Sequence, residues 1–257
     1  MNIVLDEYNW AEQAIRNRDL GANPLETLGR VSKYYIAQNY PKKEVRRMLD
    51  IFLVQCDPRT SLVQWSDTLD RIAKNSDRYP LIRIEKIDVT FGEMVKIKRL
   101  KGKQIQRLAF TLLCLAKYWD SVSQNNNHWV NVSDRDIMKL ANISTSVARQ
   151  SAMFADLREA GLIGFSKKID NLNVQVNFID DDRLSPALSV RDFRNLGYQY
   201  MMYCGEPYFE CEQCGLVTKV GDPKKGRKQK YCKNCAAEVS MRQRVEWVTR
   251  HRQVLKS

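Results

Sequence analysis

Two pairs of cysteines near the C-terminus constrain the fold of this chain more than any other feature. Cys211 and Cys214 form one C-x2-C pair, Cys232 and Cys235 form a second, and 17 residues separate the two pairs. Each C-x2-C turn places two thiolates on one side of a tight loop, and two such turns complete a tetrahedron with Zn–S bonds of about 2.3 Å. The spacing therefore predicts one Zn²⁺ held by these four residues.

The predicted zinc ion has a structural role. Four protein thiolates leave no open coordination position for a substrate or a catalytic water. We expect the four cysteines and their surroundings, residues 205–257, to form a zinc ribbon. A domain this small buries little core of its own, so we expect the metal to determine its fold. A basic helix should follow, starting near Ala236, with Val239, Val245, Trp247 and Val248 available for packing.

The remaining cysteines and the N-terminus indicate where the chain resides. Cys56, Cys114 and Cys204 are an odd number and do not suggest a disulfide framework, which favours a reducing compartment. The first ten residues lack the apolar segment of a signal peptide, and no apolar run approaches the roughly 20 residues that cross a bilayer. We therefore expect a soluble cytoplasmic protein with no membrane partner.

The charge of the chain predicts a polyanionic partner. The net charge is +12, and residues 205–257 carry 12 basic against 6 acidic residues. Such an excess is typical of proteins that bind nucleic acid. A second cluster, from Lys96 to Arg107, holds six basic residues and no acidic one, and is either a solvated loop or a phosphate contact. The candidate phosphate contacts of the ribbon and its helix are Lys224, Lys225, Arg227, Lys228, Lys230, Arg242 and Arg250.

The middle of the chain has the element order of a winged helix-turn-helix. Apolar periodicity and capping residues predict helices over 104–122, 134–140 and 145–160, a strand over 129–132, and two strands over 162–167 and 174–179. The third helix is then the candidate recognition helix. We expect Val147, Phe154 and Leu157 to face inward, and Ser146, Arg149, Gln150 and Met153 to face outward.

Several residues of this region suit DNA. Arg149 and Gln150 are residue types that bond guanine and adenine edges in the major groove. Thr145 and Ser146, at the helix start, suit a phosphate oxygen. Lys167 and Lys168 would lie on the wing. Winged helices also bind proteins, so the alternative is a module that binds a host protein or RNA.

The expected fold class is mainly α with small β. Amphipathic helices should begin at Asn23-Pro24 and after Pro41, with a third from about Leu62 and a short strand between Ile82 and Val89. The expected layout is a helical N-terminal domain (1–92), a basic connector (93–103), a winged helix-turn-helix (104–182), a linker (183–204), and a zinc ribbon with a basic C-terminal helix (205–257).

The ribbon also carries a resemblance. Its order is Cys-x2-Cys-Gly, a basic loop, Tyr-Cys-x2-Cys-Ala and an Arg-rich helix, with Cys211, Gly215, Tyr231 and Ala236 at the characteristic places. This arrangement resembles a ribbon found at the C-termini of proteins from phages and integrative elements of Gram-positive bacteria. Leu108–Lys117 and Asn195–Tyr198 are similar to uncharacterised proteins of the same genomes. The resemblance implies nucleic-acid association in a mobile element.

Catalysis is not expected. The sequence has no GxxxxGK[ST] phosphate loop and no nucleophile–base pair. His128 and His251 have no cysteine or carboxylate at ligand spacing, and the acidic run after Ile179 is typical of a solvated turn. We therefore expect a non-enzymatic double-stranded DNA-binding protein, either a transcriptional regulator or a replication-initiation factor.

Overall fold

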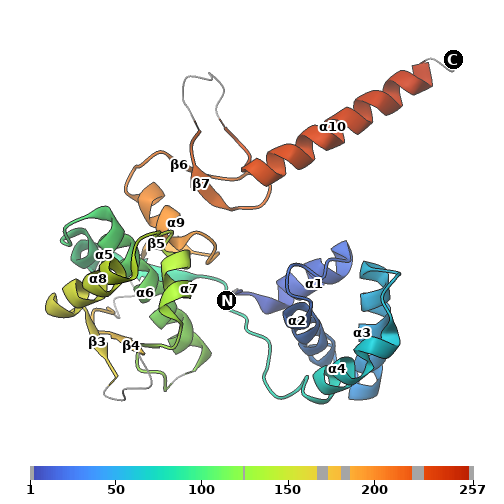
Figure 1. The fold of residues 1–257 in the computed structure, drawn as a ribbon, viewed down its shortest axis with the longest axis horizontal. Coiled ribbons are helices and arrows are strands. Elements are labelled where there is room, and N and C mark those ends of the chain that lie inside the picture. Colours follow the sequence, from blue (N-terminus) through green and yellow to red (C-terminus); the bar gives the residue numbers. More distant parts are fainter. Residues whose placement is uncertain (1–2, 124, 167–172, 181–185, 222–228, 255–257) are drawn as a thin grey trace. The chain divides into compact units, whose positions relative to one another are not determined.

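A computed structural model describes residues 3–123, 125–166, 173–180, 186–221 and 229–254 (Figure 1). The chain divides into two compact units, Asn2–Glu85 and Lys86–Ser257. The described residues are mainly helical and add three small antiparallel sheets, which confirms the mainly α class with small β. No helix in these ranges is long and apolar enough to cross a membrane.

The N-terminal unit consists of helices packed on one apolar cluster. Its helices are α1 (Glu7–Asn17), α2 (Pro24–Ala37), α3 (Lys42–Cys56) and α4 (Leu62–Lys74). Asn23 caps α2 by accepting from the Glu26 N–H, as the sequence predicts. The unit ends at Glu85, so the predicted boundary at residue 92 lies too far along the chain. The core side chains are Leu28, Val31, Val45, Leu49, Phe52, Leu53 and Leu69.

The second unit begins with β1 (Ile87–Thr90), α5 (Phe91–Lys98) and α6 (Lys103–Val122). The strand predicted from Ile82 therefore forms only from Ile87, and the Thr90–Glu93 capping box is present. The segment 93–103 is not a mere connector, because it contains most of α5. Met94 and Ile97 are buried on that helix while Lys96 and Lys98 stay exposed.

The predicted linker 183–204 is also wrong, because most of it is folded against the core. Strand β5 (Pro186–Val190) pairs antiparallel with β1, with Ile87 opposite Val190. Helix α9 (Leu196–Tyr203) packs on α6, and the rings of Phe110 and Tyr200 lie 5.4 Å apart. The apolar side chains of β5, of α9 and of the residues between them explain this: Val190, Phe193, Leu196 and Tyr200 are all buried.

The central elements follow the predicted order. After α6 come β2 (Trp129–Val130), α7 (Asp134–Leu140), α8 (Val147–Glu159), β3 (Ile163–Phe165) and β4 (Val174–Val176). The three strands form one antiparallel sheet in the order β2-β4-β3. They are shorter than predicted, and the turn expected at residues 170–171 lies outside the described residues. Gly161 follows α8 with φ of 71°, the left-handed conformation expected of a helix-ending glycine.

The orientation of α8 about its own axis differs from the prediction. Met153 is 0% exposed, although we expected it to face outward, and Val147 is 76% exposed, although we expected it to be buried. Met153, Phe154 and Leu157 together form the buried stripe of this helix. Val147 is the first helical residue and lies six positions, nearly two turns, before Met153, the first buried residue of α8.

The C-terminal part contains a small hairpin and a long helix. Strand β6 (Tyr208–Glu210) pairs antiparallel with β7 (Val217–Lys219), and α10 spans Lys233–Val254. Helix α10 starts before the expected Ala236 and extends from the hairpin as one unbroken helix (Figure 1). Val245 and Trp247, which we expected to pack, are each 59% exposed, because the distal turns of α10 extend away from the hairpin.

Candidate metal centre and nucleic-acid surface

The first C-x2-C turn closes the end of the β6–β7 hairpin. The Cys211 N–H donates to the Leu216 carbonyl at 3.0 Å, and the Gly215 N–H donates back to the Cys211 carbonyl at 2.9 Å. Gly215 has a φ of 69°, a conformation that glycine adopts without the cost that a Cβ would add. The turn thereby places Cys211 and Cys214 on the same side of the loop.

The second pair sits at the start of α10. The Ala236 N–H donates to the Cys232 carbonyl at 2.9 Å, so the first helical turn carries Cys235 back toward Cys232. Each C-x2-C pair with its turn is termed a knuckle. The two knuckles are joined by a backbone hydrogen bond of 2.9 Å from the Glu212 N–H to the Lys230 carbonyl. Two segments distant in sequence are thus held together around the four sulfur atoms.

The four sulfur atoms form a compact cluster. The Sγ atoms of Cys211, Cys214, Cys232 and Cys235 all lie within 4.8 Å of one another. The Cys214 and Cys232 sulfurs are 3.8 Å apart, too far for a disulfide. A tetrahedron with Zn–S bonds of about 2.3 Å has edges of about 3.8 Å. The sequence prediction that these four residues come together to hold a metal ion is therefore confirmed in its geometry.

The thiols differ in how readily they ionise. Burial raises the pKa of the Cys211 thiol, but hydrogen bonds from the backbone N–H groups of Cys232, Cys214 and Gln213 outweigh it and lower the pKa to about 6. One of these, from the Cys232 N–H, measures 3.3 Å. Burial raises the pKa of Cys214 and that of Cys235, and the neighbouring thiols raise the pKa of Cys235 further. All four thiols can be ionised together only if a cation balances their negative charges, because thiolates this close repel one another.

The N-terminal turn of α8 carries four of the predicted DNA contacts. Ser146 caps the helix by accepting from the Arg149 N–H at 3.3 Å, and both residues are exposed. Gln150 is half-buried, and its side-chain amide donates to the Thr145 carbonyl at 3.1 Å. Of the two side chains predicted to contact base edges, Arg149 is therefore the more exposed, a difference that the sequence did not reveal.

The remaining predicted contacts lie just before the second cysteine pair, on α10, or outside the described residues. Lys230 is exposed and its ammonium lies 3.4 Å from the Glu212 carboxylate. Arg242 and Arg250 are exposed on α10, and Arg250 pairs with Glu246 at 3.5 Å. Lys167, Lys168, Lys224, Lys225, Arg227 and Lys228 fall outside the described residues.

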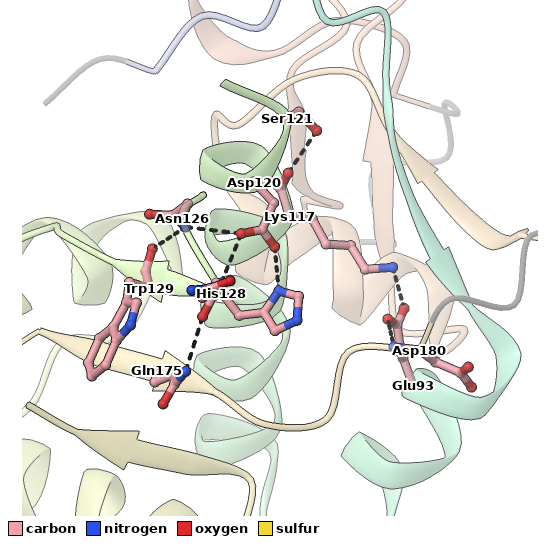
Figure 2. Close-up of polar contacts among 10 residues, drawn as sticks. Glu93, Lys117, Asp120, Ser121, Asn126, His128, Trp129, Gln175 and Asp180 are labelled. Carbon is pink, nitrogen blue, oxygen red and sulfur yellow. Dashed lines mark hydrogen bonds and ion pairs between the residues drawn. The ribbon is translucent and has the colours of Figure 1, made fainter. Parts of the chain in front are cut away.

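A buried ion pair that the sequence did not reveal ties the second unit together (Figure 2). Glu93 is fully buried, and its carboxylate accepts from Lys117 Nζ at 2.7 Å and from the Thr90 N–H at 2.8 Å. Its other oxygen accepts from the Asp180 N–H at 2.9 Å. This carboxylate joins three separate segments and has its oxygens occupied, so its role is structural.

His128 has a carboxylate partner, contrary to the expectation from its sequence neighbourhood. Its ring Nδ1 lies 2.5 Å from Asp120 Oδ2, and its backbone N–H donates to Asp120 Oδ1 at 2.9 Å (Figure 2). Asn126 also donates to Asp120, at 3.1 Å. Asn127 and His128 both have positive φ, so these bonds hold a strained loop between α6 and β2. Sequence spacing missed the pair because Asp120 projects from the end of a long helix.

Comparison with protein-family models, curated proteins and solved structures gives no match. The resemblance of the ribbon to proteins of phages and integrative elements therefore stays a prediction, and the proposed function rests on the geometry of the chain itself.

Proposed function

We propose that the cysteine cluster binds one structural Zn²⁺ and that residues 205–257 form a zinc ribbon continued by a basic helix. Two features support this: the sulfur separation of 3.8 Å, and a ligand set of four thiolates that leaves no open coordination position. The metal would neutralise the clustered thiolates and fix the two knuckles. Iron also accepts four thiolates in a tetrahedron, so the metal must be identified directly.

We further propose that α6 to β4 form a winged helix-turn-helix with α8 as its recognition helix. The order of helices and strands supports it, as does the three-stranded sheet packed against them. The turn between α7 and α8 is short and contains Asn142 with a φ of 55°. Such a turn allows two helices to cross while the second presents its N-terminal residues to a groove.

Double-stranded DNA is the proposed ligand, bound without catalysis. The observation that carries this proposal is the start of α8, which leaves Ser146 and Arg149 exposed while Met153, Phe154 and Leu157 further along the helix are buried, on a chain with a net charge of +12. Arginine at such a position bonds guanine edges, and the helix start accommodates a phosphate. The resemblance of the ribbon suggests a transcriptional regulator or a replication-initiation factor of a mobile element.

Salt-dependent binding tests this proposal. Fluorescence anisotropy with a labelled duplex should give an affinity that falls steeply between about 50 and 200 mM salt, because lysines and arginines displace counterions from phosphates. Selection from random duplexes should then enrich one sequence. Binding that is absent, or flat across this range, would remove DNA as the ligand.

A second candidate function is binding of a host protein or RNA through the same modules. The exposed apolar side chains of α10 favour it: Met241 is 70% exposed and Trp247 is 59% exposed. The Trp247 ring stacks on His251 with ring centroids 4.0 Å apart, a platform on which an unpaired base can also stack. Competition of single-stranded RNA against duplex DNA for the same chain separates the two functions.

A further inference from the structure

The segment 192–199, which we term the bridge, makes two hydrogen bonds to the metal-binding hairpin. Arg194 Nη2 donates to the Cys214 carbonyl at 2.6 Å, and Asn195 Nδ2 donates to the Val217 carbonyl at 3.0 Å. Cys214 is a proposed metal ligand, and Val217 begins the strand that follows its knuckle. The bridge therefore contacts the backbone that holds the sulfur atoms in place.

The other side of the bridge contacts the turn between α7 and α8. Asn142 Nδ2 donates to Asn195 Oδ1 at 2.9 Å, and the Tyr198 N–H donates to Asn142 Oδ1 at 3.2 Å. The Asn195 amide thus donates to the hairpin and accepts from the turn. A single side chain connects the two, and both ends of its amide group are used.

Asn142 determines how α7 ends and where α8 begins. Its N–H donates to the Lys139 carbonyl at 3.1 Å, and the Ile143 N–H donates to the Met138 carbonyl at 2.9 Å, which is the Schellman pattern of helix termination. Asn142 occupies the left-handed region, with a φ of 55°. Ser146, the cap of α8, follows four residues later. A change at Asn142 would therefore move the start of α8.

The bridge and α7 also touch through their backbones. A Cβ added at Gly197 would lie 1.9 Å from the Ala141 carbonyl oxygen, so the first turn of α9 rests directly on the end of α7. On the hairpin side, the rings of Tyr198 and Tyr208 pack with centroids 4.9 Å apart. Contacts this close leave little room for α7, the bridge and the hairpin to move relative to one another.

We propose that Arg194 and Asn195 are positioning residues that join the metal-binding ribbon and the helix-turn-helix into one rigid body. Metal binding orders the hairpin, and the bridge transmits that order to the α7–α8 turn and the start of α8. The metal supplies folding free energy to the ribbon, which has little core of its own. This inference rests on the proposed metal site, and it is independent of DNA binding.

Hydrogen exchange of the full-length chain, followed by mass spectrometry with and without a zinc chelator, tests the coupling. Chelation should speed exchange in the hairpin and, about tenfold, in the turn 141–146, as expected when the protection given by about one hydrogen bond disappears. Asn195→Asp keeps the acceptor for Asn142 and removes the donor to Val217. Aspartate also tolerates the left-handed backbone of this position, where φ is 55°. In this variant the turn should exchange fast even with metal bound, and chelation should add little.

A matched control is Asn75→Asp in the N-terminal unit, which also removes an amide donor to a carbonyl, that of Arg71 at 2.9 Å. It should leave the response of the turn to chelation at the wild-type level. The metal content of each variant is measured first. A wild-type chain that holds no metal would contradict both the metal site and the coupling. A chain that holds metal, but whose turn does not respond to chelation, would overturn the coupling alone.

Discussion

Replacing Gly197 by alanine probes the contact between α9 and α7. The added Cβ would lie 1.9 Å from the Ala141 carbonyl oxygen and 2.5 Å from its carbon, and both are backbone atoms that no side-chain rotation can move. The first turn of α9 must therefore withdraw. Overpacking of this kind costs about 1–3 kcal/mol, equivalent to about 2–4 °C in melting temperature per kcal/mol for a unit of this size.

Gly29→Ala is the matched control for this substitution. Gly29 also lies in a helix, α2, and a Cβ there would meet no atom within 4 Å, so this change should stabilise its unit by up to about 1 kcal/mol. Thermal unfolding followed by near-ultraviolet circular dichroism compares the two variants with the wild type. A Gly197→Ala protein as stable as the wild type would refute the close backbone contact.

Three further outcomes follow from the site and the core. Arg149→Ala should cost about 1–3 kcal/mol of binding at a selected duplex, with little loss on random DNA, as measured by anisotropy. Glu93→Gln leaves Lys117 without its buried counter-charge and should destabilise the second unit by about 3 kcal/mol in chemical denaturation; a loss below about 1 kcal/mol would contradict that ion pair's role. The combined variant Lys224→Ala, Lys225→Ala and Arg227→Ala removes three charges from the basic loop and should weaken binding to all duplexes about equally. In a salt titration followed by anisotropy, the salt slope should fall by up to about one for each phosphate partner removed.

Local signals in the sequence predicted the cysteine cluster and six helices, but not α1 or α9; the six are α2, α3, α4, α6, α7 and α8. Asn23 caps α2 where predicted, and Thr90 and Ser133 cap α5 and α7 in the same way, because a capping side chain needs only the N–H groups two or three residues ahead. The C-x2-C pairs act in the same way, since each turn forms within four residues. Such contacts are visible in sequence because the partners are near neighbours.

Long-range contacts were not predictable in the same way. The pairing of β1 with β5 joins residues about a hundred positions apart, and the short apolar run of β5 gives no sign of its partner. Asn142 and Asn195 likewise lie 53 positions apart in the sequence, and nothing near either residue indicates its partner. The burial of Val147 and Met153 was predicted wrongly for a similar reason. Periodicity gives the spacing of the apolar residues along α8, but not which turns of the helix contact the core.

The metal content of freshly purified, unchelated protein tests the central claim most directly. Elemental analysis together with native mass spectrometry should find one zinc per chain, and Cys235→Ser should lose it while the N-terminal unit stays folded. A chain without bound metal, or one that holds iron in place of zinc, would contradict the proposed structural zinc site.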